Sequence, residues 1–189
     1  IEQRGTTNLQ AYNLYLMARQ RYATGQMSDS RRSDTVIRLC RGAIELDPNY
    51  ARAWALMATA QRHRMYATGK GDNGSAAAAR AIELDANLAE AHAAKAGVLA
   101  AAGDYGAAEE ELAVAMRLDP DSVDVMQEAA RLHFMLKRYE KAAASWDRYA
   151  TLVETDIASG GLLITCYTAL GNRANVERVA QRTMARAEK

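Results

Sequence analysis

The stretches that decide the fold are AIELDP at residues 43–48, AIELDA at residues 81–86 and AMRLDP at residues 115–120. They are near copies of one segment, and their last residues lie 38 and 34 positions apart. A segment that recurs at an interval of about 20 to 50 residues indicates an array of repeated structural units. The longer interval implies an insertion of four residues. We therefore expect a chain built from repeats of about 34 residues.

One of these repeats, from Ala89 to Ser122, resembles the tetratricopeptide repeat, a helix–turn–helix unit of about 34 residues. The matching positions are Ala96 at the small site, Leu99 at the tyrosine site, Gly103-Asp104-Tyr105 at the turn, Ala108, Leu112 and Ala115 on the second helix, and Pro120 at the end. Shifts of about 34 residues place units at 8–48, 49–86, 87–120, 121–154 and 155–188. The resemblance implies an all-α fold, a right-handed α-solenoid of about five helix pairs, in a single domain at 1–189.

The hydrophobic pattern agrees with paired helices. Ala108, Leu112 and Ala115 recur at i, i+4 and i+7, which places them on one helical face. Small residues recur where paired helices approach, and a bulkier side chain there costs about 1–3 kcal/mol. These residues are Ala58, Ala96 and Ala130. The expected helices span 8–24, 33–46, 49–66, 74–84, 87–102, 104–117, 121–136, 138–152, 156–170 and 172–187, with polar insertions at 26–32 and 68–73.

Charge and hydropathy argue against two classes of partner. The formal net charge is +1, which gives no reason to expect nucleic acid. No apolar run approaches the length of a membrane span. Cys40 and Cys166 lack metal-ligand spacing and are expected to be two buried thiols. Because the sequence begins with Ile1, we expect a fragment of a longer protein, and we favour the bacterial cytoplasm over the periplasm.

No catalytic or cofactor site is expected. The stretch GKGDNG at residues 69–74 lacks the Ser or Thr after lysine, and the preceding strand, that a phosphate-binding loop needs. It is therefore interpreted as a loop between helices. His63, His92 and His133 do not pair with a second metal ligand at a suitable spacing. We predict that the chain is not an enzyme and that it holds no metal and no cofactor.

A ligand is expected on the first helix of each pair. These helices line the concave side of a helical solenoid, and the resembled family commonly holds an extended peptide or a partner's helix there. Helical spacing predicts a groove lined by Tyr15, Arg19, Tyr22, Arg52, Thr59, Arg62, His63, Ala93, Gly97, Gln127, Arg131 and Phe134. Guanidinium groups suit bidentate capture of carboxylates, and the small residues of the third unit leave room for an apolar side chain. The predicted ligand is an acidic peptide with one apolar anchor; the alternative is that the arginines are solvated or pair with Glu90 and Asp124.

The predicted function is a scaffold for interaction with a protein or peptide. A second resemblance supports an alternative: AYNLYLMAR at 11–19, together with residues 43–50, is similar to repeats that follow nucleotide-cyclase or winged-helix regulator domains in bacterial signalling proteins. It implies a regulatory or oligomerising arm of a larger protein. Self-association into a homo-oligomer, through exposed apolar surface, is also left open.

Overall fold

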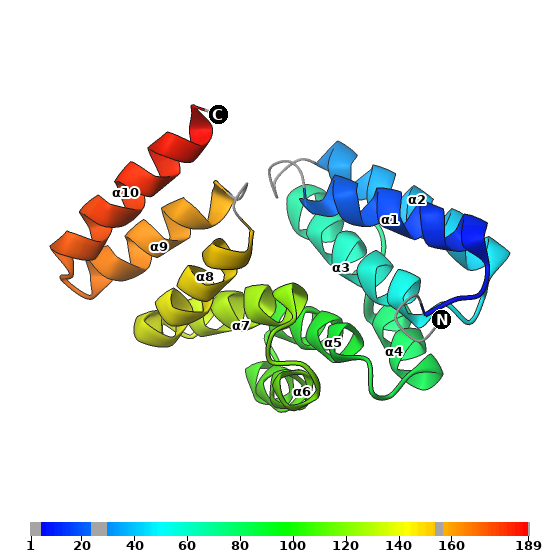
Figure 1. Cartoon of the computed structure of the whole chain (residues 1–189). Helices are drawn as coiled ribbons and strands as arrows, with labels where there is room; N and C mark the ends of the chain where they lie inside the picture. The colour runs from blue at the N-terminus through cyan, green and yellow to red at the C-terminus, as the bar shows by residue number, and fades with distance from the viewer. Residues whose placement is uncertain (1–4, 24–29, 154–156, 189) are drawn as a thin grey trace. The chain divides into compact units, whose positions relative to one another are not determined.

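The chain is a series of helices. A computed structural model describes residues 5–23, 30–153 and 157–188, and the regular structure within these ranges consists of ten helices and no strand. The helices group into two compact parts: the first ends at Asp119 and contains six of them, and the second begins at Pro120 and contains four (Figure 1). The all-α prediction is confirmed, and the assignment of residues 1–189 to a single domain stays a prediction.

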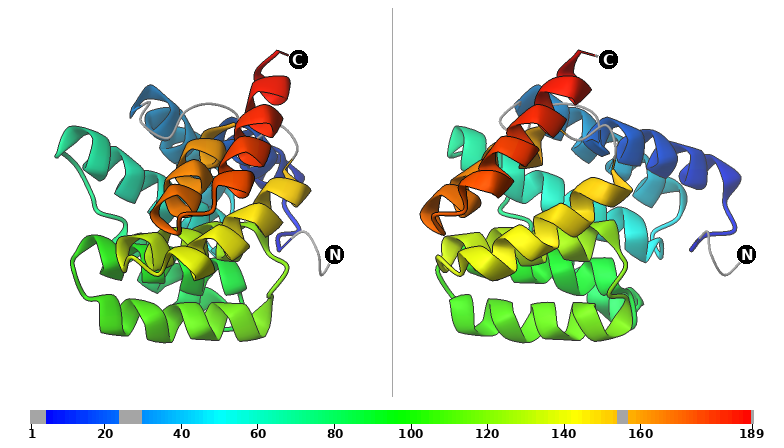
Figure 2. Two further views of the ribbon diagram at one scale, coloured as in Figure 1. Left: turned by 90° about the vertical axis from the view of Figure 1, so that its left-hand side faces the viewer. Right: turned by 60° about the vertical axis from the view of Figure 1, so that its left-hand side comes forward.

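The helices follow one another at short intervals. Their bounds are α1 (Leu9–Ala23), α2 (Ser30–Leu46), α3 (Ala51–Thr68), α4 (Ser75–Leu84), α5 (Ala89–Ala101), α6 (Tyr105–Leu118), α7 (Val123–Met135), α8 (Tyr139–Leu152), α9 (Ala158–Ala169) and α10 (Arg173–Ala187). Consecutive helices pack in pairs, and Figure 2 shows α9 and α10 side by side as one such pair. The described bounds agree with the predicted ones within two residues, except at the start of α2.

The start of α2 corrects one prediction. Residues 26–32 were expected to be a polar insertion, but α2 already begins at Ser30, while residues 26–29 lie outside the described part of the chain. The physical reason for the earlier start of α2 is that Arg32 lies on the buried face of this helix. It lies four residues before Val36 and eight before Cys40, so its side chain extends their buried stripe by one turn.

The near copies at 43–48 and 81–86 form the same turn between repeats. In each copy the aspartate side chain accepts a hydrogen bond from the amide two residues later, at 3.1 Å for Asp47 and 3.0 Å for Asp85. The aspartate carbonyl oxygen accepts from the amide three residues later, at 3.1 Å and 3.2 Å. The residue reached in this way, Tyr50 or Leu88, is buried and precedes the next helix. The shared sequence therefore encodes a turn that stops one helix and starts the next.

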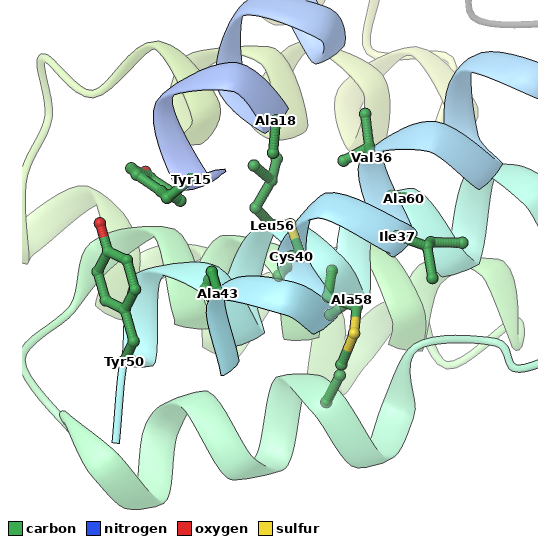
Figure 3. Packing of buried hydrophobic residues seen from close by; sticks show 14 of the residues in the cluster. Tyr15, Ala18, Val36, Ile37, Cys40, Ala43, Tyr50, Leu56, Ala58 and Ala60 are labelled. Carbon is green, nitrogen blue, oxygen red and sulfur yellow. The ribbon is translucent and has the colours of Figure 1, made fainter. Parts of the chain in front are cut away.

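Alanine-rich packing brings the helices close together. The small sites Ala58, Ala96 and Ala130 are buried as predicted, with exposed fractions of 1% or less. Figure 3 shows the core of α1–α3, where Ala18, Ala43 and Ala58 lie among larger side chains such as Val36, Ile37 and Leu56. The second part has its own core, which contains Trp146, Leu163, Cys166 and Val179. Each of the two parts therefore contains buried hydrophobic clusters of its own.

The turn inside a helix pair repeats with a period of 34 residues. Gly103, Lys137 and Gly171 have positive φ angles of 86°, 57° and 68°. The residue after each of them donates its amide hydrogen to a carbonyl five residues back, at 2.8–3.0 Å, which is the closing bond of a Schellman turn. Two units place glycine at this position and the fourth places lysine, although a side chain with a Cβ is strained there. Lys137 therefore has a left-handed backbone conformation at a position where the third and fifth units have glycine.

We expect Lys137→Gly to raise the free energy of unfolding of the second part by about 0.5–1 kcal/mol. Relief of a left-handed residue is worth about 1–2 kcal/mol, and the greater unfolded-state freedom of glycine offsets part of it. Urea unfolding followed by Trp146 fluorescence, in a Trp54→Phe background, measures the change. Lys137→Ala is the matched control, because it removes the charge and keeps the Cβ. Equal stability of the glycine and alanine variants would contradict the expectation.

Candidate functional site

The predicted groove residues of the first part come from three helices. α1 carries Tyr15, Arg19 and Tyr22, α3 carries Arg52, Thr59, Arg62 and His63, and α5 carries Ala93 and Gly97. Because α3 contacts both α1 and α5, the three helices form one continuous layer. The structure therefore places these nine residues on adjacent helices, as the helix-pair pattern predicts. We call this set the α1–α3–α5 face.

The α1–α3–α5 face is less exposed than helical spacing implies. The side chains of Arg62 and His63 are buried, with exposed fractions of 6% and 4%. Tyr15, Ala93 and Gly97 are also buried. The half-buried members are Arg19, Tyr22, Arg52 and Thr59. A ligand that met this face would reach the half-buried residues first.

A stack of side chains ties α1, α2 and α3 together at one end of this face. The Tyr22 ring lies 5.9 Å from the His63 ring, with the two planes 10° apart. The Arg32 guanidinium lies 5.3 Å from the centre of the Tyr22 ring, and its Nη1 donates to the Tyr22 carbonyl oxygen at 2.8 Å. A cation over an aromatic face is held by the ring quadrupole. The stack thus holds the positive charge of Arg32 against the Tyr22 ring, whose stacking partner is His63.

Arg32 is a site residue that the sequence analysis missed. It is 4% exposed, which is unusual for arginine. The signal was its spacing from Val36 and Cys40, since residues four and eight apart share a helical face. The prediction of a loop at 26–32 hid that relationship.

Arg52 lies at the other end of α3, beside a buried tyrosine. The Tyr50 ring packs 5.1 Å from the Tyr15 ring, and burial raises the pKa of Tyr50, while the positive charge of Arg52 opposes that shift. Among the residues that the structure describes, Arg52 makes no hydrogen bond or ion pair. Its guanidinium is half-buried, and its role in binding a ligand stays a prediction.

Charge is segregated along the first part, although the whole chain carries only +1. Residues 5–80 contain eleven basic and five acidic residues, a net charge of +6. Residues 81–119 contain two basic and eight acidic residues, a net charge of −6. The excess of positive charge therefore lies in residues 5–80, which include three exposed arginines of α2, namely Arg31, Arg38 and Arg41, outside the α1–α3–α5 face.

The acidic half of the first part is held by its own ion pairs. His92 Nδ1 lies 2.7 Å from Glu111 Oε2, and Lys95 Nζ lies 2.6 Å from Glu111 Oε1. The other ring nitrogen of His92 lies 3.0 Å from the Ala86 carbonyl oxygen. Burial raises the pKa of Glu111, but its hydrogen bonds with Lys95 and His92 outweigh that effect and hold the pKa below its usual value. These contacts join α5 to α6 and to the turn before α5.

In the second part, α7 carries the predicted groove residues Gln127, Arg131 and Phe134. All three are half-buried. The Phe134 ring lies 5.5 Å from the Trp146 ring and 5.9 Å from the Tyr139 ring, both at edge-to-face angles. Phe134 thus contributes to the α7–α8 core as well as to the α7 surface. The groove role of these three residues stays a prediction.

The described residues hold no group of three or more His, Cys, Asp or Glu side chains that could bind a metal ion. The two thiols are buried and free, as predicted, and burial raises the pKa of Cys40 to about 12 and that of Cys166 to about 11. A thiol with such a pKa is a weak nucleophile at neutral pH. Residues 69–74 form the loop between α3 and α4. No described helix is long and apolar enough to cross a membrane.

Comparison with known proteins agrees with this geometry. Residues 99–150 match the tetratricopeptide repeat family. No curated protein sequence matches the chain. Among solved structures, a thermophilic tetratricopeptide-repeat protein of Thermus thermophilus is 16% identical, with a TM-score of 0.69, and the match covers 95% of this chain and 92% of that one.

Two further solved structures share the fold. MamA from Desulfovibrio magneticus is 12% identical, with a TM-score of 0.56 and coverage of 97% of this chain and 98% of that one. In the structure of Naa15/Naa10 bound to HypK, the matched chain is 16% identical, with a TM-score of 0.51, and the match covers 89% of this chain and 24% of that one. The chain therefore has the tetratricopeptide-repeat fold, an α-solenoid of helix pairs. The resemblance to repeats of bacterial cyclases and regulators stays a prediction.

Proposed function

We propose that the chain is a protein-docking scaffold whose α1–α3–α5 face binds an acidic segment of a partner protein. The observation that carries the proposal is that cationic and aromatic side chains recur along α1 and α3, from Arg52 at one end of α3 to the Tyr22–His63 stack at the other. Arg19 on α1 and Arg52 on α3 are half-buried, and Arg32 of α2 is stacked on Tyr22. Guanidinium groups in such surroundings bind carboxylates through charge-assisted, bidentate hydrogen bonds.

The fold supports a docking role. The tetratricopeptide-repeat fold presents the first helices of successive pairs as one extended surface, which suits a peptide or a helix of a partner. One solved structure of this fold, Naa15/Naa10, is bound to another protein, HypK. The charge distribution adds selectivity, because the net charge of +6 over residues 5–80 attracts an acidic segment and the −6 over residues 81–119 repels it.

The ligand that fits best is an acidic peptide with one apolar side chain. Carboxylates would meet Arg19 and Arg52, and the apolar side chain would lie toward α5, where Ala93 and Gly97 offer no bulky side chain. The alternative, a regulatory or oligomerising arm of a larger bacterial signalling protein, needs no peptide ligand. A binding experiment separates the two.

We expect a random peptide display library selected on the chain to yield acidic peptides that carry one large apolar residue. Their affinity should fall at least about 10-fold for the Arg19→Gln/Arg52→Gln variant, because hydrogen bonds to a charged group contribute about 1.5–3 kcal/mol. Fluorescence anisotropy with a labelled selected peptide measures this change. These two arginines are chosen because they are half-buried, whereas charge removal at the buried Arg62 would also disturb the fold.

Matched controls separate charge from shape. The same peptide with Gln in place of each Glu should bind at least about 10-fold more weakly, and binding should weaken as salt screens the charges. Arg117→Gln is the control variant, because Arg117 is exposed on α6 and outside the proposed face. Selected peptides without net negative charge, or peptides that bind the Arg19→Gln/Arg52→Gln variant equally well, would overturn the proposal.

A further inference from the structure

The loop between α3 and α4 contains the only Asn-Gly pair of the sequence, Asn73-Gly74. Asn73 is exposed to solvent, whereas Gly74 is buried directly before α4. The backbone nitrogen of the residue after an asparagine can attack the side-chain amide carbon, which closes a five-membered succinimide ring. Glycine hinders this attack least, because it has no Cβ. Asn73 is therefore the asparagine of this sequence with the least hindered neighbour.

The side chain of Asn73 is folded toward the amide that would attack it. Its Oδ1 atom accepts a hydrogen bond from the Ser75 amide at 2.9 Å. This bond closes a small ring of atoms that includes both Asn73 Cγ and the Gly74 nitrogen, so the two reacting atoms belong to one turn. The Gly74 amide donates to no other residue in the part of the chain that the structure describes. No hydrogen bond between described residues therefore has to break before this nitrogen reacts.

The Ser75 amide also assists the reaction electrostatically. When the Gly74 nitrogen attacks, negative charge develops on Asn73 Oδ1, and a backbone N–H about 2.7–3.1 Å from such an oxygen stabilises that charge. The Ser75 amide lies within this range. Ser75 is the first residue of α4, so the partial positive charge of the helix N-terminus adds to the effect. The turn thus supplies the nucleophile, the carbonyl group and a donor for the developing charge.

A second asparagine makes the same turn without the glycine. Asn8 Oδ1 accepts a hydrogen bond at 3.0 Å from the Gln10 amide, which also lies two residues later. The residue between them is Leu9, whose side chain crowds the backbone nitrogen. Asn8 Nδ2 also donates to the Leu46 carbonyl oxygen at 3.1 Å, which holds the leaving group in place. Asn8 is therefore a control that the chain itself provides.

We propose that Asn73 deamidates spontaneously in the folded chain through a succinimide with Gly74, and that the isoaspartate product detaches α4 from α3. The Gly74 nitrogen loses its proton to water and bonds to Asn73 Cγ; the Cγ–Nδ2 bond then breaks, and ammonia leaves after it takes a proton from water. Water adds to one of the two ring carbonyl groups. Ring opening at Cγ gives aspartate, and ring opening at the main-chain carbonyl carbon gives isoaspartate. The reaction consumes only water and changes no oxidation state.

The consequence for α4 follows from the close approach of Gly74 to α3. A Cβ on Gly74 would clash with the Ala58 carbonyl oxygen, so the backbone here fits against α3 without spare room. Isoaspartate at position 73 lengthens the main chain by one methylene directly before this contact. The packing of α4 on α3 should therefore loosen. The α5–α6 pair should stay unchanged, because Glu111 joins these helices through His92 and Lys95.

Ageing of the full chain at mildly alkaline pH, followed by trypsin digestion and mass spectrometry, tests the chemistry. The peptide of residues 71–80 should gain the mass of an amide converted to an acid, in two products. An isoaspartate methyltransferase should label one of them, and the rate should rise with pH because the Gly74 amide must lose a proton. The peptide of residues 5–19, which contains Asn8, should stay unmodified over the same period. An unaged sample corrects for reaction during digestion.

Hydrogen–deuterium exchange of the aged chain tests the consequence. Exchange in α4 should be at least about 10-fold faster than in the unaged chain, and exchange in α6 should be unchanged. Asn73→Asp is the matched control, because it has the new charge on an ordinary backbone and should exchange as the unaged chain does. Asn73→Ser, which lacks the amide, should show no effect of ageing.

Two results would overturn the deamidation step. One is an Asn73 that stays intact in the folded chain while a synthetic peptide of residues 67–79 converts, because the fold would then protect it. The other is conversion to aspartate without isoaspartate, because the succinimide gives both. Isoaspartate with unchanged exchange in α4 would overturn the detachment of α4. None of these results depends on peptide binding by the α1–α3–α5 face.

Discussion

We expect the substitution Gly74→Ala to lower the free energy of unfolding of the α1–α6 part by about 3 kcal/mol. Gly74 precedes α4 with a φ of 89°, a conformation that costs a residue with a Cβ about 1–2 kcal/mol. A Cβ at this position would also lie 2.3 Å from the Ala58 carbonyl oxygen, and such overpacking costs a further 1–3 kcal/mol or so. Because the obstacle is the backbone of α3, no change of side-chain rotamer relieves it.

Gly69→Ala is the matched control for this prediction. Gly69 also has a positive φ, of 66°, but a Cβ there would meet nothing within 4 Å. The control therefore carries the conformational cost of about 1–2 kcal/mol without the steric one. Hydrogen–deuterium exchange of peptides from α3 and α4 measures both changes, since an exchange rate rises about 10-fold for each 1.4 kcal/mol lost in the opening equilibrium. Equal effects of the two substitutions would show that α4 does not approach α3 as closely as described.

Gly74 also shows how far a repeat pattern predicts structure. It lies 34 residues before Ala108 and 68 before Ala142, the small buried residues of two later units. The sequence analysis placed Gly74, which shares the register of these alanines, as the first residue of a helix over 74–84. In the structure α4 begins at Ser75, and Gly74 takes a left-handed conformation at the same close contact. A small residue at position 74 agrees with the 34-residue register, whereas the left-handed conformation of Gly74 depends on the turn that precedes α4.

The helices themselves were predictable because the signals are local. Repeated Asp turns, small residues and apolar spacing act within about ten residues, so they give the helix bounds without knowledge of the tertiary structure. The start of α2 was missed because the spacing of Arg32 from Val36 and Cys40, which is local, does not show that an arginine is buried there. Arg32 is buried because Tyr22, ten residues earlier on α1, lies under its guanidinium.

The exposure of the candidate site was harder to predict than its location. Helical spacing identifies the side of a helix on which a residue lies, but it does not show what covers that side. His63 was expected to line a groove, yet Tyr22 stacks on it from a helix 41 residues away in the sequence. Phe134 was expected to face the same groove, yet its ring meets Trp146 of α8. Both outcomes depend on contacts between helices.

The side chain of Asp147 joins three helices of the second part and had no signal in the sequence. Its carboxylate on α8 accepts hydrogen bonds from the Tyr167 hydroxyl on α9 and from Arg178 and Arg182 on α10. The two arginine nitrogens lie 2.9 Å and 3.2 Å from the carboxylate oxygens. The Asp147 side chain is 25% exposed, so water screens these interactions only in part.

We expect Asp147→Asn to lower the free energy of unfolding of the second part by about 2 kcal/mol at pH 7. Hydrogen bonds to charged groups contribute about 1.5–3 kcal/mol each, but the exposure of Arg178 reduces its share. Asp121→Asn is the matched control: Asp121 pairs with Arg148, but both side chains are more than half exposed, so its loss should change stability by less than about 0.5 kcal/mol. Urea unfolding followed by Trp146 fluorescence in a Trp54→Phe background measures both variants.

The effect of Asp147 should depend on pH with a definite sign. Burial raises the pKa of Asp147, but hydrogen bonds from Tyr167 and Arg178, together with the charges of Arg178 and Arg182, outweigh burial and hold the pKa below its ordinary value. A group whose pKa is lower in the folded chain stabilises it above the unfolded pKa, about 3.9 for aspartate, and this contribution is lost as the pH falls through the folded pKa. The stability difference between wild type and Asp147→Asn should therefore be constant above about pH 5 and should shrink steadily toward pH 3. A difference that stays constant down to pH 3 would show that the carboxylate is not held in its charged form by these partners, and that the three helices are joined chiefly by their apolar core.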